Sequence, residues 1–351
     1  MVADQVIGHS GLGLVCDHGL NDSLKTREII TMQLIELTDP HSDSSASIAA
    51  ELGFNCFRFL ARLADGRTVS VLSAADRFEE GGQRPSHSGI PLLFPYPNRI
   101  ESGRYFWMQH NYHLPEGLVP YDKTGNAIHG FCIDRPWRIA EQSESSATGV
   151  FRLSLDAPDR LPLWPTDAEI SVSYRVIGSC LRSDIRVFNP TDRPLPWGFG
   201  THPYFSVPLS STSSASQCRI FAPSARVWEL NACLPSGAKK EPPVNGRLNE
   251  DPAFGGLTLD DVYTDLTTSD GIIVCRITDP SAGLAIEQRC SSGFREIVAF
   301  TPPWSSSVCL EPYTCLTNAI NLQQNGVDAG LQVLAPGTEW RGWIEIEARA
   351  L

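Results

Sequence analysis

Residues 168–176 have the sequence AEISVSYRV, in which apolar and polar side chains alternate without exception. Successive side chains of a β-strand point to opposite faces of its sheet, so this alternation predicts a strand with one buried face. The same period of two recurs in residues 151–156 and 343–347, and less regularly in residues 273–278. We therefore expect strands along much of the chain.

Turn-forming sequences separate these predicted strands. Residues 189–192 (NPTD) and 279–283 (DPSAG) are two examples, and the 28 Gly and 26 Pro of the 351 residues provide many more positions for chain reversal. No long amphipathic helix is evident. Many short strands joined by turns are typical of an antiparallel sandwich or barrel, so we predict an all-β fold.

The pattern also suggests how the chain is divided. Residues 1–30 show neither periodicity nor a motif, and we expect them to form a poorly packed N-terminal extension. Strand patterning continues on both sides of the Ser-rich residues 210–216, which makes that segment a surface loop and not a linker. Residues 31–351 are therefore predicted to form a single domain.

The charge of the chain limits the classes of partner. Its formal net charge is −12. Nucleic-acid phosphates and anionic lipids both require a basic protein surface, so this charge argues against either partner. No segment approaches the roughly 18 uninterrupted apolar residues of a membrane span. We expect a neutral small molecule as the ligand.

The ten cysteines are scattered, and none forms the Cys-x-x-Cys pair of zinc or thioredoxin-type sites. Cys275 and Cys309 lie in apolar, strand-like runs, where we expect small buried side chains. The N-terminus lacks a basic segment followed by an apolar one, the pattern of a secretory signal. These features favour reduced thiols, no bound metal and a cytoplasmic location.

Two ionisable residues lie where predicted strands end. In residues 304–314 (WSSSVCLEPYT) an apolar run leads to Glu311 and is stopped by proline. In residues 198–205 (GFGTHPYF) a proline fixes the backbone after His202, and aromatic residues surround the imidazole. A carboxylate and an imidazole held rigidly at the edge of a cleft are suited to act as general base and general acid.

A stiff segment supplies two further candidates. Residues 89–100 (GIPLLFPYPNRI) contain three prolines, which impose an extended backbone. That backbone presents Asn98 and Arg99 at a fixed angle, suitable for forked hydrogen bonds to vicinal hydroxyls. The alternative is an arginine paired with a surface carboxylate.

The last candidates are a second histidine and an aspartate doublet. His129 precedes Gly130, which permits the close approach of a ligand, although a purely structural histidine is the alternative. Asp260 and Asp261 lie in the sequence LDDVY, and such doublets are also common as turn or cap residues.

The segments PLLFPYPNRI, IHGF, GTHPYF, LDDVY and CLEPYT occur between residues 91 and 314. In this order they resemble the aldose 1-epimerases, the galactose mutarotase family. The large antiparallel β-sandwich of that family, a supersandwich, agrees with the alternation described above. The resemblance implies that Glu311 is the general base and His202 the general acid. It also implies that the sugar is bound by Asn98, Arg99, His129 and Asp260, with the Leu-Asp register favouring Asp260 over Asp261.

The activity implied by the resemblance is interconversion of the α and β anomers of a free aldohexose by ring opening and reclosure. This reaction requires no cofactor. A hexose-6-phosphate 1-epimerase is the main alternative; it needs additional cations, for which Arg84 and Arg135 are candidates. A glycoside hydrolase using Glu311 and Asp260 is a further possibility, as is a non-catalytic carbohydrate-binding protein.

Overall fold

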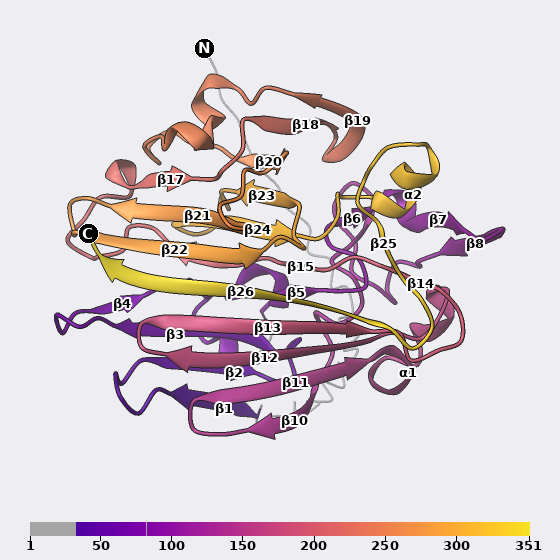
Figure 1. The fold of residues 1–351 in the computed structure, drawn as a ribbon, viewed down its shortest axis with the longest axis horizontal. Helices are drawn as coiled ribbons and strands as arrows, with labels where there is room; N and C mark the ends of the chain where they lie inside the picture. The colour runs from indigo at the N-terminus through magenta and orange to yellow at the C-terminus, as the bar shows by residue number, and fades with distance from the viewer. Residues whose placement is uncertain (1–32, 82) are drawn as a thin grey trace, which may run out of the picture. The chain divides into compact units, whose positions relative to one another are not determined.

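Antiparallel β-strands are the main secondary structure (Figure 1). This computed structural model describes residues 33–81 and 83–351, so the predicted extension at residues 1–30 lies outside the described residues. The α-helices found there, α1 (Leu153–Asp156) and α2 (Ala319–Gln324), are short. No helix in the described part of the chain is long and apolar enough to cross a membrane. The predicted all-β fold is confirmed.

The first large sheet has eight strands, and it contains the alternating segment that predicted the fold. Residues 168–176 coincide closely with β12, in which Ile170, Val172 and Tyr174 are fully buried. The strand order is β10 (Arg138–Gln142), β11 (Ser146–Arg152), β12 (Glu169–Ile177), β13 (Cys180–Phe188), β26 (Glu339–Ala350), β22 (Leu284–Ser291), β21 (Ile272–Asp279) and β17 (Arg219–Phe221).

The second large sheet carries Glu311 on its central strand, β24 (Ser307–Tyr313), whose residues are all buried. On one side β24 pairs with β23 (Glu296–Phe300), and on the other with both β15 (Gly200–Thr201) and β16 (Tyr204–Ser206). The remaining strands are β19 (Leu234–Lys240), β18 (Arg226–Asn231), β20 (Asp260–Thr264) and β5 (Leu92–Leu93).

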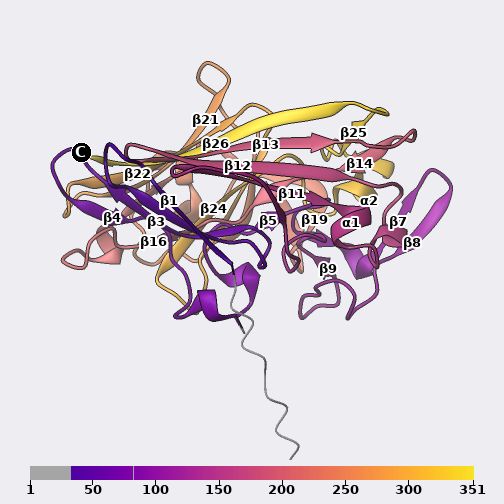
Figure 2. The same cartoon turned by 90° about the horizontal axis from the view of Figure 1, so that it is seen from below.

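A four-stranded sheet lies against one face of the first large sheet (Figure 2). It consists of β1 (Leu34–Thr38), β2 (Ser45–Ala49), β3 (Asn55–Arg62) and β4 (Thr68–Ser70). Apolar side chains of both sheets, among them Ile48, Phe59 and Val172, belong to one continuous core. Burial of this apolar surface is the main force that holds the layers together.

Smaller elements connect the sheets. The two-stranded pairs are β14 (Leu195–Trp197) with β25 (Gln332–Leu334), β6 (Arg99–Ile100) with β9 (Ala127–Ile128), and β7 (Arg104–Trp107) with β8 (His110–His113). Single 3₁₀ turns occur at Phe78–Glu80, Pro85–His87, Glu101–Gly103, Leu161–Leu163, Ala215–Gln217, Val244–Gly246 and Leu248–Glu250. The Ser-rich segment at residues 210–216 lies in a connection outside the strands, as expected.

Glu296, on β23, is a carboxyl group buried in the second large sheet, with an exposed fraction of 0%. Its Oε2 accepts a hydrogen bond of 3.1 Å from Trp228 Nε1. Its Oε1 has no hydrogen-bond partner among the described residues, and the nearest cationic nitrogen, Arg295 Nε, lies 3.8 Å away. Burial disfavours the charged form and raises the pKa of Glu296 to about 7.

We expect Glu296 to make the protein less stable as the pH rises from about 4.5 to about 7. The folded carboxyl keeps its proton up to about pH 7, whereas the same group in the unfolded chain releases its proton near pH 4.5. The stabilising contribution of the protonated carboxyl is therefore complete below about pH 4.5 and is lost as the pH rises through about 7. The free energy of unfolding falls by roughly 3 kcal/mol over this range. Urea unfolding at a series of pH values should show this decline in the wild type and a smaller one in Glu296→Gln.

The exposed Glu79→Gln variant is the control and should follow the wild-type curve. Equal pH dependence in the Glu296→Gln variant and the wild type would show that Glu296 titrates normally in the folded protein.

Candidate active site

A cavity of about 790 Å³ lies beside β24. Its wall includes side chains from β20, β23 and β24 and from the segments at residues 84–87, 98–99, 117–124 and 128–129. The structure brings together in this wall all six site residues predicted from the sequence, namely Asn98, Arg99, His129, His202, Asp260 and Glu311.

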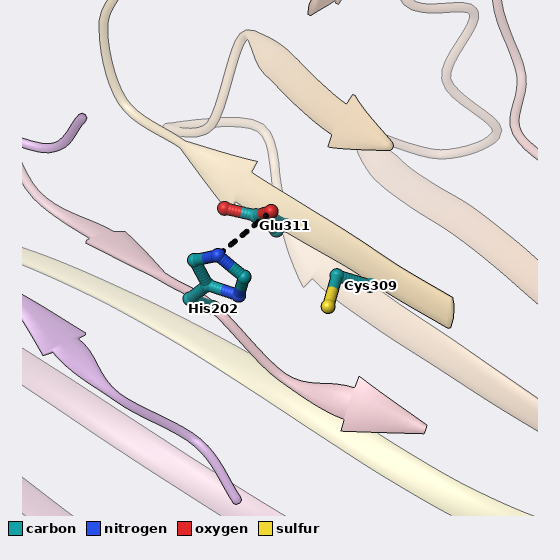
Figure 3. A group of neighbouring side chains, drawn as sticks. All are labelled: His202, Cys309 and Glu311. Atoms are coloured by element: carbon teal, nitrogen blue, oxygen red, sulfur yellow. Dashed lines mark ion pairs between the residues drawn. The ribbon is translucent and has the colours of Figure 1, made fainter. Parts of the chain in front are cut away.

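Glu311 and His202, both in this wall, face each other (Figure 3). Glu311 Oε1 lies 3.3 Å from His202 Nε2, and the two residues are only 1% and 7% exposed. Burial raises the pKa of Glu311 well above its usual range and lowers that of His202 to about 3. Between these two pKa values the pair holds a single proton and carries no net charge.

Glu311 does not end its strand, contrary to the prediction. β24 continues through Pro312 to Tyr313, and Pro312 pairs with Ile297 on β23. The N–H of Thr314 donates to Phe199 on the β15 side, so by alternation the nitrogen of Pro312 faces the same side. There the neighbouring strand is interrupted between β15 and β16, at residues 202–203, so the missing N–H of proline costs no ladder hydrogen bond.

A second hydrogen bond orients the Glu311 carboxyl. The Tyr313 hydroxyl donates to Glu311 Oε2 at 2.5 Å, and both side chains project from the same face of β24. Tyr313 is paired with Gly200 on β15. A Cβ at position 200 would lie only 2.3 Å from Cδ1 of the tyrosine ring, so the glycine leaves the space in which Tyr313 reaches Glu311.

Aromatic rings hold the His202 imidazole in place, as the sequence predicted. The imidazole stacks on Tyr204 with ring centroids 4.8 Å apart and an interplanar angle of 7°. Phe300 and His129 contact it edge-on, with centroids 6.1 Å and 5.6 Å away. Its backbone N–H donates to the carbonyl of Pro91 at 3.0 Å. His202 Nδ1 is buried and has no hydrogen-bond partner among the described residues.

The pairing of β6 with β9 brings Asn98, Arg99 and His129 together. Asn98 and His129 both have positive φ, and the N–H of His129 donates to the carbonyl of Asn98 at 2.8 Å. Arg99 donates to Asn98 Oδ1 at 2.8 Å and to Asp122 Oδ2 at 2.6 Å. Arg99 is thus paired with a carboxylate, which was the alternative to binding hydroxyls of a ligand, and it also lines the cavity.

Gly130 serves a different purpose from the one predicted. A Cβ at this position, where φ is +75°, would lie 2.3 Å from the carbonyl oxygen of Phe94. The glycine therefore allows the close approach of another backbone segment and not of a ligand. His129 Nδ1 is buried without a partner among the described residues, and burial lowers the pKa of its imidazole well below the usual value.

Strand alternation separates the two members of the aspartate doublet. Asp260 lines the cavity, and Cys233 Sγ lies 3.7 Å from its Oδ2. Asp261, the next residue of β20, is not among the residues of the cavity wall, and burial raises the pKa of its carboxyl. Asp260 pairs with Phe300, which also lines the cavity, so the register places Asp260 on the cavity side.

The cavity also contains side chains that the sequence analysis did not identify. His87, Asp122 and Trp304 left no signal in the sequence, because each joins the site through contacts between distant segments. Tyr313 contacts Glu311 from outside the cavity wall, and it was missed because the predicted strand ended at Pro312. A strand continued past this proline places Tyr313 on the same face as Glu311.

A buried thiol completes the surroundings of the pair. Ligand atoms of His202, Cys309 and Glu311 lie within 4.8 Å of one another, and these are donor types that bind zinc (Figure 3). Cys309 is fully buried, as expected, and burial raises the pKa of its thiol well above the usual value. A thiol must lose its proton to bind a metal, so these residues fit a proton-sharing pair with an inert neighbour better than a metal centre.

The sequence profile of one family, described as aldose 1-epimerase, matches residues 61–347. The chain belongs to the aldose 1-epimerase family. Membership implies an epimerase-type isomerase that acts on sugars. Among curated proteins, the chain is 23% identical over 257 residues to the uncharacterised protein YihR of Escherichia coli K12, a match that covers 73% of this chain and 77% of YihR.

Solved structures share the fold of this aldose 1-epimerase family member. A galactose mutarotase-like protein from Clostridium acetobutylicum superposes with a TM-score of 0.78 at 21% identity, covering 92% of this chain and 99% of that one. A GalM/aldose epimerase homologue from C. elegans gives 0.74 at 15% identity, with coverages of 91% and 99%. At such identities the similarity shows the fold alone.

Removing the Tyr313 hydroxyl should raise the pKa of Glu311 further. The hydroxyl donates a hydrogen bond that stabilises the ionised carboxylate, and Tyr313→Phe deletes this bond while keeping the ring. Carbon-13 NMR of protein labelled at its glutamate carboxyls would report the shift directly. Glu311→Gln identifies the resonance.

Tyr263→Phe is the matched control, because it also deletes a buried hydroxyl hydrogen bond, to the carbonyl of Gly246 at 2.5 Å, outside the cavity wall. An unchanged Glu311 titration in Tyr313→Phe would show that this hydrogen bond does not tune the carboxyl.

Proposed function

We propose that this protein is an aldose 1-epimerase that interconverts the α and β anomers of a free aldohexose. The observation that carries the proposal is the buried Glu311–His202 pair, 3.3 Å apart in the cavity wall. The anomeric hydroxyl and the ring oxygen of an aldose are bonded to the same carbon. Ring opening removes a proton from the first and adds one to the second, so an acid and a base this close together can serve both oxygens.

The pair can complete the reaction with the single proton that it holds. Glu311, as carboxylate, takes the proton of the anomeric hydroxyl while His202, as imidazolium, protonates the ring oxygen. The ring C–O bond breaks, and the open aldehyde rotates about its C1–C2 bond. Glu311 then returns its proton to the carbonyl oxygen as His202 removes the proton of the attacking hydroxyl. In the free protein the raised pKa of Glu311 and the lowered pKa of His202 place the shared proton on Glu311, so the cycle begins with its transfer to the imidazole. The Arg99 charge favours the ionised carboxylate and disfavours the imidazolium.

The polar residues of the cavity wall are proposed to hold the sugar. Asn98, Arg99 and His129 offer donors, and Asp260 offers an acceptor, at positions around the reacting pair. The buried, unpartnered Nδ1 of His129 is a group for which a sugar hydroxyl would be a suitable partner.

A hexose-6-phosphate substrate has partial support. Arg84 and Lys123 line the cavity, and neither forms an ion pair within the part of the chain that the structure describes. The other candidate cation, Arg135, instead pairs with Asp159 at 2.5 Å and is not part of the cavity wall. Comparing kcat/KM for glucose, galactose and glucose 6-phosphate distinguishes the two substrates.

A glycoside hydrolase and a non-catalytic carbohydrate-binding protein are less well supported. Asp260 is a second carboxyl group in the cavity wall, but the Glu311 carboxyl contacts an imidazole and a tyrosine hydroxyl, and a glycoside hydrolase built on Glu311 and Asp260 would leave the two histidines of the wall without a role. A non-catalytic binding protein would not need a buried acid–base pair. We also propose a cytoplasmic location, which the free cysteines of the described residues support.

Glu311→Gln and His202→Asn should each lower turnover by about 10²–10⁴-fold, because each removes a proton-transfer group and replaces it with an amide that does not titrate. Polarimetry of freshly dissolved α-glucose and α-galactose measures the rate once spontaneous mutarotation has been subtracted. Circular dichroism should show that both variants remain folded. Sugar binding that persists alongside wild-type rates in Glu311→Gln would refute the assignment.

Asp260→Asn should raise KM for the sugar several-fold, while Asp261→Asn should leave KM close to the wild-type value. Only Asp260 lines the cavity, so only its carboxylate can accept hydrogen bonds from sugar hydroxyls there. Steady-state polarimetry of the two variants side by side provides the measurement, and each variant is the control for the other. The reverse order of effects would assign the sugar contact to Asp261.

A further inference from the structure

Asp122 lies in the cavity wall, and the proposed reaction gives it no role. Its side chain is only 10% exposed, and its Oδ2 accepts a hydrogen bond of 2.6 Å from Arg99 Nε. Arg99 is one of the residues proposed to hold the sugar. The contact therefore joins a carboxylate that takes no part in proton transfer to a guanidinium that would bind the substrate.

A turn formed by residues 122–126 holds the Asp122 carboxylate in place. Asp122 Oδ1 accepts hydrogen bonds of 2.9 Å from the backbone N–H groups of Thr124 and Asn126, an arrangement that aspartate side chains form readily. The N–H of Asp122 donates to the carbonyl of Asn126 at 2.9 Å and closes the same turn. Burial raises the pKa of Asp122, but the hydrogen bonds from Asn126, Arg99 and Thr124 outweigh it and lower the pKa to about 2. Asp122 is therefore a fixed anion at neutral pH.

The Arg99 guanidinium is held at two points. Its Nε donates to Asp122, and its Nη1 donates to Asn98 Oδ1 at 2.8 Å. A guanidinium is planar and rigid, so two contacts on different nitrogens determine the direction in which its other N–H groups point. The backbone of Arg99 is fixed as well, because it pairs with Ile128 on β9. Without Asp122 the long side chain would be free to rotate about its remaining contact.

The orientation of Arg99 is passed on to the reacting pair through Asn98. Because Asn98 Oδ1 accepts from Arg99, the amide nitrogen of Asn98 is left to donate. Burial raises the pKa of Tyr313 well above its usual value, and a side-chain hydrogen bond from Asn98 opposes this rise. The Tyr313 hydroxyl in turn donates to Glu311 Oε2. A continuous series of contacts therefore leads from the turn at residues 122–126 to the Glu311 carboxyl.

Asp122 also supplies a counter-charge to Arg99. Burial raises the pKa of Glu311 and lowers that of His202, and the Arg99 charge acts to lower both values. Burial also lowers the pKa of His129; the Arg99 charge adds to this effect, and the Asp122 charge opposes it. A carboxylate 2.6 Å from the guanidinium thus offsets part of a positive charge that acts on all three ionisable groups.

We propose that Asp122 is a positioning residue, which holds Arg99, and through Arg99 the Asn98 amide, in the orientation that binds the sugar. Asp122 transfers no proton and acts only through the guanidinium that it holds. A sugar bound by a misdirected guanidinium would place its anomeric hydroxyl and ring oxygen poorly for proton transfer, so both binding and turnover depend on Asp122. This inference rests on the proposed function, since it assigns a further role within the same site.

The test compares Asp122→Asn in the wild type and in an Arg99→Met background. The amide oxygen of the new side chain can still accept from the turn, whereas its amide nitrogen cannot accept from Arg99. We expect kcat/KM for glucose or galactose to fall about tenfold in the wild-type background, corresponding to about 1.4 kcal/mol, with a raised KM. In the Arg99→Met background the same substitution should change kcat/KM by less than about twofold, because no guanidinium remains to be held.

Asp167→Asn is the matched control. Asp167 Oδ2 accepts from Arg152 Nε at 2.7 Å and its Oδ1 accepts from the N–H of Ser154 at 2.9 Å, so the same kind of ion pair and backbone contact is changed. None of these three residues lines the cavity. Asp167→Asn should keep wild-type rates, and circular dichroism should show that both variants remain folded. An equal loss of activity in Asp167→Asn would count against a specific role of Asp122.

Calorimetric binding of methyl glucoside and methyl galactoside tests the positioning independently of catalysis, because these glycosides have no free anomeric hydroxyl. Binding that is weakened by Asp122→Asn only when Arg99 is present supports the inference even if no mutarotation is found, an outcome that would overturn only the proposed function. Wild-type binding and rates in Asp122→Asn, or equal losses with and without Arg99, would overturn the inference. Mutarotation by the wild type would in that case leave the proposed function standing.

Discussion

The site depends on one requirement, that a carboxyl group buried on the central strand of a sheet must have hydrogen-bonding partners. Glu311 lies on β24, where exclusion of water makes an isolated negative charge unfavourable. The carboxyl therefore needs partners, and the fold provides one for each oxygen. His202 faces Oε1 from the end of β15, and Tyr313 donates to Oε2 from the same strand. Because β15 pairs with β24, strand register determines the distance between the carboxyl and the imidazole.

The rest of the cavity wall depends less on regular structure. Asn98 and His129 are held in left-handed backbone conformations at the ends of a two-stranded pair. Two arginines of the wall are neutralised by carboxylates from the same region, Arg99 by Asp122 and Arg160 by Asp134. Such pairs give the cavity many hydrogen-bonding groups and offset the charges of Arg99 and Arg160, which suits a ligand rich in hydroxyls.

The sequence predicted the fold where one strand face is buried and the other is not. In β12 the alternation is complete because the polar face lies at the surface, and the prediction was confirmed. The same rule is less informative for β24, which is buried on both faces, so local sequence wrongly places the end of this strand at Pro312. A proline within a sheet is tolerated only where no ladder bond is needed, and that depends on the neighbouring strand and not on local sequence.

The site residues divide in a similar way. Glu311, His202 and Asp260 stand in short motifs, so the sequence indicated them, and strand alternation then separates Asp260 from Asp261. Trp304 and His87 come from segments more than two hundred residues apart and meet only through tertiary packing. No local pattern records such a contact, which is why the sequence does not predict the wider part of the cavity.

The single proton held by Glu311 and His202 has a further consequence for turnover. In the proposed cycle, Glu311 returns on ring closure the proton that it took on ring opening, and His202 regains the proton that it gave. No proton therefore has to be taken from the surrounding water or released into it. The rate of such an enzyme is independent of how quickly buffer molecules can deliver protons to a deep site. A buried position for the reacting groups is therefore compatible with rapid turnover.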